Sequence, residues 1–161
     1  MINKPVNSSN IDKIFNQLKK RYCYYNNTVI SCCFNKSKIL CYGISKSDNH
    51  IHSIKNNKQF SIHAEIDALN NYYSKYKKNI RKKNDKINIL TIRIINNIAV
   101  NAKPCQFCVK SFQKTYNINK IYYSDDNFIY CDTFKNLYKN INNLKYSSGD
   151  RRVYKNINYN N

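Results

Sequence analysis

Acidic side chains are scarce in this sequence of 161 residues, in which nine aspartates and glutamates stand against 28 lysines and arginines. Glutamate occurs once, as Glu65, two residues after a histidine in the segment SIHAEIDALN. A lone glutamate beside a histidine calls for a physical reason. Glu65 is either an ordinary charge on a helix, such as a cap, or a group with a chemical role.

Long apolar runs are also missing. No segment approaches the about 20 apolar residues that span a bilayer. The opening residues, MINKPVNSSN, lack the apolar core of a secretory signal. We therefore expect a soluble, cytoplasmic protein without membrane contact. The seven cysteines are an odd number, so we expect reduced thiols in a reducing compartment rather than a closed set of disulfides.

Neither an internal repeat nor a domain linker interrupts the chain, and 42% hydrophobic residues suffice for one core. Periodicity and turn signals predict helices over 11–21, 62–76, 104–116 and 133–144, and strands over 28–34, 38–44, 87–95, 120–124 and 128–132. The sequence thus predicts one α/β domain over residues 1–161. We expect the core to cover about 11–144 and residues 145–161 to form a polar, basic tail. A central mixed sheet of about five strands would be flanked by helices.

Helical spacing also predicts which side chains face the core. In the helix over 62–76, Ser61 is the expected cap, and Ile66, Leu69 and Tyr73 share one face. We interpret Phe107 and Phe112, in the helix over 104–116, as core residues rather than platforms for stacking bases.

The formal net charge of +19 has two interpretations. Such a field attracts polyanions, which favours a nucleic-acid or phosphorylated partner. The lysines are scattered, however, and a chain rich in Asn, Lys, Ile and Tyr also arises from codon usage alone. The basic run KYKKNIRKKNDK is typical of a solvated connector. Charge therefore leaves the partner open.

Two cysteines have a spacing that metals use. Cys105 and Cys108 share one side of a helix start, so both can reach one ion, and His63 offers an imidazole at the start of another helix. Zinc accepts thiolate and imidazole ligands, and a catalytic site keeps three protein ligands with one position open. These three residues predict one zinc ion per chain. Glu65 would be the neighbouring carboxylate that moves protons; in a closed structural site it would be a cap.

The segments HAE at 63–65 and PCQFC at 104–108 together resemble the zinc-dependent cytidine and deoxycytidylate deaminase superfamily, whose signature is H-x-E followed by P-C-x-x-C. The order of predicted elements over about 11–132 is similar to that family as well. The resemblance implies a three-layer cytidine deaminase-like fold. It also implies that Glu65 shuttles protons while zinc activates the water that attacks C4 of cytosine.

Two sequence features that distinguish the branches of this superfamily point to different branches. The short link between strands 120–124 and 128–132 permits an antiparallel pair, which resembles the free cytidine deaminases. In that branch, however, a third cysteine usually stands where His63 stands here.

Relatives that act on tRNA end the second hairpin strand with Gly-x-Asn, whereas this chain has Ser45 at the last position. The resemblance further implies that Ala64 and Pro104 line the pocket, with Ser45 or Asn49 as substrate contacts.

The sequence therefore predicts a zinc-dependent hydrolase that converts the cytosine of a nucleoside or nucleotide to uracil and releases ammonia. One alternative is a polynucleotide deaminase that acts on single-stranded DNA or RNA, including tRNA, at cytidine or adenosine. Another is a zinc-stabilised binding module without turnover. By analogy with relatives, we also expect association into a homo-oligomer.

Overall fold

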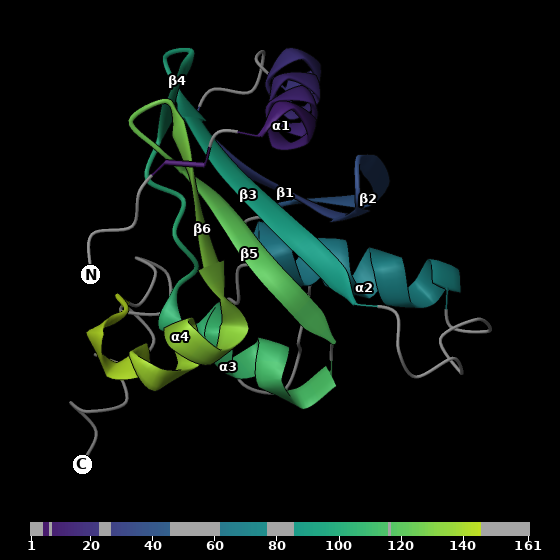
Figure 1. Ribbon diagram of the computed structural model, residues 1–161, viewed down its shortest axis with the longest axis vertical. Helices are drawn as coiled ribbons and strands as arrows, with labels where there is room; N and C mark the ends of the chain where they lie inside the picture. Colours follow the sequence, from purple (N-terminus) through teal and green to yellow (C-terminus); the bar gives the residue numbers. More distant parts are fainter. Residues whose placement is uncertain are drawn as a thin grey trace, which may run out of the picture.

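The computed structural model describes residues 5–6, 8–22, 27–45, 62–76, 86–115 and 117–145 (Figure 1). Its elements follow in the order α1 (Ser9–Tyr22), β1 (Thr28–Asn35), β2 (Lys38–Ile44), α2 (Ala64–Tyr76), β3 (Ile87–Ile95), β4 (Ile98–Val100), α3 (Gln106–Thr115), β5 (Ile118–Asp125), β6 (Phe128–Thr133), α4 (Phe134–Lys139) and the 3₁₀-helix η1 (Ile141–Asn143). Within these residues, every helix is too short or too polar to cross a bilayer.

One mixed sheet organises the described residues. Its strand order is β2-β1-β3-β5-β6, with β4 paired to β3. β3 and β5 run parallel, and the other pairs are antiparallel. The predicted hairpin, the central position of residues 87–95 and the antiparallel final pair are confirmed. The expected α/β class, with a mixed sheet flanked by helices, is confirmed with them.

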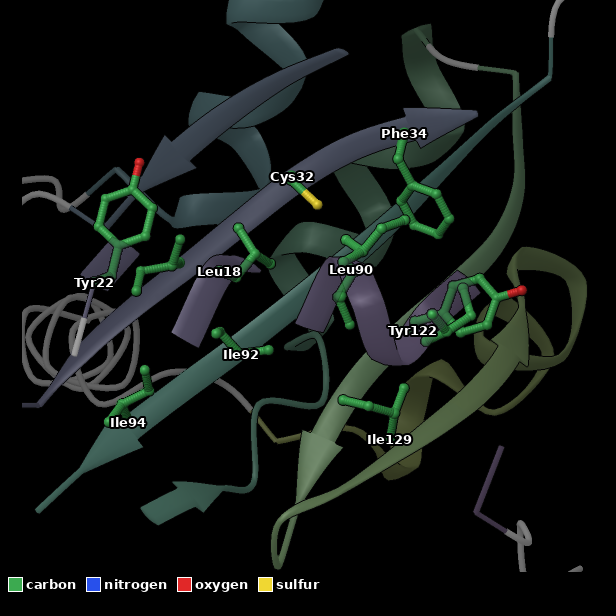
Figure 2. Close-up of a cluster of buried hydrophobic side chains, with 12 residues drawn as sticks. Leu18, Tyr22, Cys32, Phe34, Leu90, Ile92, Ile94, Tyr122 and Ile129 are labelled. Carbon is green, nitrogen blue, oxygen red and sulfur yellow. The ribbon is translucent and has the colours of Figure 1, made fainter. Parts of the chain in front are cut away.

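Alternate residues of the strands face two different helix layers. Ile30, Cys32 and Phe34 of β1 pack with α1 and with the even-numbered residues of β3, as Figure 2 shows for Cys32, Leu90 and Ile92. Cys33 and Ile89 point to the opposite face, where they pack with α2, α3 and α4. Figure 1 shows α1 apart from these three helices across the sheet. The period-2 pattern of the strands thus produces three layers.

Strand β4 is absent from the prediction. Asn96 and Asn97 both have positive φ, which is the conformation of a type I′ turn between antiparallel strands. β4 has only three residues, so alternation within it is too short to notice. The Asn-Asn pair between two apolar segments is the signal that could have revealed it.

The final helix is shorter than predicted. Thr133 caps α4, because its hydroxyl accepts a hydrogen bond from Asn136 N at 3.2 Å. The α-helix ends at Lys139, and the chain then tightens into η1 rather than continuing to Leu144. At Asn140 the side-chain amide donates to the carbonyl of Asn136, as the backbone N–H also does, so a local side-chain bond marks the break.

The prediction for the apolar face of α2 was wrong at one position. Tyr73 is 40% exposed, whereas Ala64, Ala68 and Leu69 are fully buried. The side that faces the sheet is made of small residues, because the backbone of α2 approaches β2 closely. The expected Ser61 cap and residues 77–85 of the basic run KYKKNIRKKNDK lie outside the described residues.

Candidate metal centre

His63 and Cys105 both lie at the N-cap positions of helices. The His63 carbonyl accepts a hydrogen bond from Asp67 N at 2.9 Å, and the Cys105 carbonyl accepts one from Val109 N at 3.1 Å. The helices therefore begin one residue after these side chains, at Ala64 and Gln106. The predicted starts at Ile62 and Pro104 were two residues early. Side chains at N-caps project beyond the helix, which leaves them available to a ligand.

A glycine determines how closely α2 approaches the sheet. A Cβ atom added at Gly43 in β2 would overlap the Ala64 carbonyl oxygen and the backbone nitrogen of Ala68, and would lie 2.7 Å from Ala68 Cα. All three atoms belong to the first turns of α2. The absence of a side chain at Gly43 therefore fixes the depth of the helix that carries Glu65.

Polar side chains on α2 tie the helix to the outer backbone groups of β2. Asp67 Oδ2 accepts from Ile44 N at 3.1 Å, and Asn71 Nδ2 donates to Tyr42 O at 2.8 Å. Lys75 Nζ lies 3.5 Å from Leu40 O. We call these three contacts the α2–β2 ladder. They recur every four residues on the helix and every two on the strand, and they fix the helix along its length.

The segment before Cys105 is anchored to the end of β5. Ala102 N donates to Ser124 O at 2.9 Å, and Asn101 Nδ2 donates to Asp125 Oδ2 at 3.0 Å. The buried Ser124 hydroxyl donates to Val100 O at 2.7 Å and accepts from Arg93 N at 3.2 Å. Ser124 therefore joins β3, β4 and β5 directly before the chain reaches Cys105.

Removing the Ser124 hydroxyl should loosen this anchor. We expect Ser124→Ala to lower the free energy of unfolding by about 2 kcal/mol, because two partly buried backbone groups, Arg93 N and Val100 O, lose their partner. Urea unfolding of the metal-free protein measures the change. Ser111→Ala is the control, since Ser111 is only partly buried and its hydroxyl donates an exposed hydrogen bond to the Phe107 carbonyl of its own helix. Equal effects of both substitutions would contradict the role of Ser124.

The start of α3 is held from its other side by the residues around η1. Gln106 is buried; its backbone N–H donates to Lys145 O at 3.1 Å and its side-chain amide donates to Ile141 O at 3.0 Å. No local sequence pattern indicates this clamp at Gln106, because the partner residues lie 35 or more positions away.

The structure brings the three predicted ligands together. His63 Nδ1 lies 3.2 Å from Cys108 Sγ and 3.3 Å from Cys105 Sγ. All three donor atoms lie within 4.8 Å of one another, and among the described residues they form the group suited to hold a metal ion. Ligand atoms around a tetrahedral zinc, at bond lengths of 2.0–2.3 Å, are about 3.5 Å apart. The donor set and its spacing therefore fit zinc.

Local hydrogen bonds favour the ionised form of one ligand. A hydrogen bond from Cys108 and the neighbouring His63 lower the pKa of Cys105 to about 5, against the opposing effect of burial. Cys108 N also lies 3.5 Å from Cys105 Sγ, so the first turn of α3 presents a backbone donor to the sulfur. A thiolate is thus favoured at Cys105 near neutral pH, as metal ligation requires.

Glu65 lies against this cluster and is 5% exposed. Burial raises its pKa from 4.5 to about 7, and the Cys105 charge adds to the rise. Its own backbone N–H, His63 and a hydrogen bond from Cys108 act in the opposite direction. A surface charge would have none of these features. Glu65 is therefore a buried carboxyl group in contact with a candidate metal ligand.

The raised pKa of Glu65 has a consequence for stability. When the pKa of an acidic group is higher in the folded than in the unfolded state, ionisation of that group destabilises the fold. The protein therefore loses stability as pH rises from 4.5, the ordinary pKa of the glutamate, through about 7, its pKa in the folded state. Above that window, we expect metal-free Glu65→Gln to be more stable than wild type by up to about 3 kcal/mol, and to match it near pH 4.5. Urea unfolding at several pH values measures this. A difference that does not change with pH would contradict it.

The predicted substrate contacts are placed as follows. Ser45 follows β2 directly, and its hydroxyl accepts from Val29 N at 3.3 Å. Ala64 and Pro104 are buried beside the ligands His63 and Cys105. Asn49 lies outside the described residues. Substrate contact by any of the four stays a prediction.

One aromatic side chain at the site differs from the prediction. Phe112 is buried in the core, as expected, but Phe107 is 42% exposed. Its ring centroid lies 5.6 Å from that of His63, with 55° between the ring planes. Helical spacing could not reveal this contact, because His63 belongs to a distant segment that precedes another helix, α2.

The mixed sheet with helices on both faces, together with the His63, Cys105 and Cys108 triad, is consistent with the cytidine and deoxycytidylate deaminase class. Similar solved structures include the dCMP deaminase from the cyanophage S-TIM5. Its apo crystal structure is 19% identical, covers 74% of this chain and 86% of that chain, and has a TM-score of 0.49. The structure of its complex with dCMP and dUMP is 18% identical, covers 73% of this chain and 83% of that chain, and has a TM-score of 0.47. No family model and no curated protein matches the chain.

Proposed function

We propose that this chain is a zinc-dependent hydrolase that converts the cytosine of a nucleoside or nucleotide to uracil and releases ammonia. The observation that supports this best is the buried Glu65 in contact with a triad of three metal-ligating side chains. A structural zinc site is closed by four protein ligands, whereas three ligands beside a proton-carrying group are typical of a catalytic site.

His63, Cys105 and Cys108 would hold the ion. Zinc bound there supplies Lewis-acid activation of water. Glu65 accepts a proton from the attacking water and delivers it to the ring nitrogen next to the carbon under attack. It then carries a second proton to the departing amino group, which leaves as ammonia. Burial favours the neutral form of Glu65, so the group can donate as well as accept a proton, which suits this double role.

Two hypotheses compete with this function. A polynucleotide deaminase is favoured by the net charge of +19, since backbone phosphates attract such a surface. A zinc-stabilised binding module would use the same triad without turnover.

The described cysteines are free thiols, which suits the reducing compartment that we propose for the protein. Homo-oligomer formation also stays a prediction.

One experiment separates the three functions. Purified protein is assayed for zinc and then for ammonia release from cytidine, deoxycytidine, their monophosphates, adenosine and short single strands. Turnover of a free nucleoside or nucleotide supports the proposal. Turnover of single strands alone, with binding that weakens steeply as salt rises, would favour the polynucleotide enzyme. Zinc without turnover favours the binding module, and absence of zinc after remetallation would refute all three.

A further inference from the structure

An aromatic ring packs against the only histidine among the proposed ligands. Phe107 lies in the first turn of α3, between Cys105 and Cys108 in the chain, and its ring is tilted against the His63 imidazole at 5.6 Å between centroids. Its neighbours Gln106 and Cys108 are buried, while Phe107 is 42% exposed. Phe107 therefore stands at the outer side of the cluster rather than within the core.

The ligands differ in how their orientation is fixed. Cys108 is fully buried within α3, and Cys105 accepts a backbone hydrogen bond from the same helix. His63 precedes α2 and is only partly buried, so its ring is less enclosed by the fold than the Cys108 side chain. A ring with two rotatable side-chain bonds must lose that freedom before Nδ1 can face both sulfur atoms. The contact with the Phe107 ring restricts the rotation of the imidazole on one side.

We propose that Phe107 is a positioning residue for His63. Its ring holds the imidazole in the orientation that directs Nδ1 toward Cys105 and Cys108, and it thereby raises the affinity of the site for zinc. Tilted aromatic pairs at this distance are favourable. Hydrogen-bonding partners that orient a metal-ligating histidine typically change metal affinity 10- to 100-fold, and an aromatic pair reaches the lower end of that range, about tenfold. This role does not depend on deaminase activity, because a catalytic and a purely structural zinc would need it equally.

The test is a competition titration of zinc against a chromophoric chelator. We expect Phe107→Ala to weaken zinc binding about tenfold. Phe107→Tyr, which keeps the ring, should bind as wild type does, and Phe107→Leu, which keeps most of the volume, should fall between. Phe128→Ala is the matched control: Phe128 is 57% exposed on β6, which contributes no ligand. Equal affinity of Phe107→Ala and wild type would overturn the proposal.

A double-mutant cycle shows whether Phe107 acts through His63. In a His63→Ala background, where zinc is held by fewer ligands, Phe107→Ala should cause no further loss of affinity. An undiminished, additive loss would show that Phe107 acts elsewhere, and would overturn the proposal. Cobalt substitution gives a second readout, because its visible absorption reports ligand geometry. The spectrum should change in Phe107→Ala and stay unchanged in Phe128→Ala; an unchanged spectrum in both would contradict the positioning role.

Discussion

The Glu65→Gln variant is expected to keep one zinc ion per chain and to release ammonia about 100- to 10,000-fold more slowly than wild type. Glutamine has nearly the shape of glutamate, so the packing against Cys108 should persist. It cannot accept a proton from water or carry one to the ring nitrogen. Zinc content, measured on the same sample as the rate, separates loss of proton transfer from loss of the metal.

Asp67→Asn is the matched control for this variant. Asp67 lies two residues further along α2, and its carboxylate accepts a hydrogen bond from Ile44 N. The amide oxygen of asparagine can still accept that bond, so activity should stay within a few-fold of wild type. If Glu65→Gln keeps more than a tenth of the wild-type rate with zinc bound, Glu65 is not the proton shuttle.

The Gly43→Ala substitution is expected to lower the free energy of unfolding by about 4 kcal/mol or more. The added methyl group would overlap backbone atoms of Ala64 and Ala68, which cannot move aside as a flexible side chain can. The helix must shift away from β2, and the α2–β2 ladder must lengthen with it. Urea unfolding of the metal-free protein and the yield of soluble protein both measure the effect.

A second substitution tests whether backbone crowding is the cause. Ala68→Gly removes a side chain but leaves the backbone atoms that the new methyl group would meet. The double variant Gly43→Ala, Ala68→Gly should therefore be no more stable than Gly43→Ala alone. Recovery of stability would show that crowding involves side chains, and a loss below 1 kcal/mol for Gly43→Ala would contradict the close approach.

Local sequence patterns were sufficient for most of the sheet. Runs such as TVISCCF and INILTIRII carry the β-branched and apolar residues typical of buried strands, and both form strands where expected. The exposure of Tyr73 could not be predicted in this way. Which side of α2 faces the sheet depends on Gly43, a residue in a different element that admits the helix at close range.

The grouping of the three candidate ligands was predictable for a different reason. Their spacing, HAE and PCQFC, is local, and a helix start gives each segment a defined geometry. The surroundings were not predictable, because they arise from contacts across the fold. The burial of Glu65, the exposure of Phe107 and the clamp at Gln106 each depend on elements that are distant in the chain.

The α2–β2 ladder also links solubility to the integrity of the site. β2 is the last strand on its side of the described sheet, and such edges can recruit a strand from another molecule. Here Asp67, Asn71 and Lys75 occupy the outward backbone groups of Ile44, Tyr42 and Leu40. An incoming strand would have to displace α2, and Glu65 would move with it. Aggregation through this edge therefore requires the same rearrangement that would separate Glu65 from the candidate metal centre.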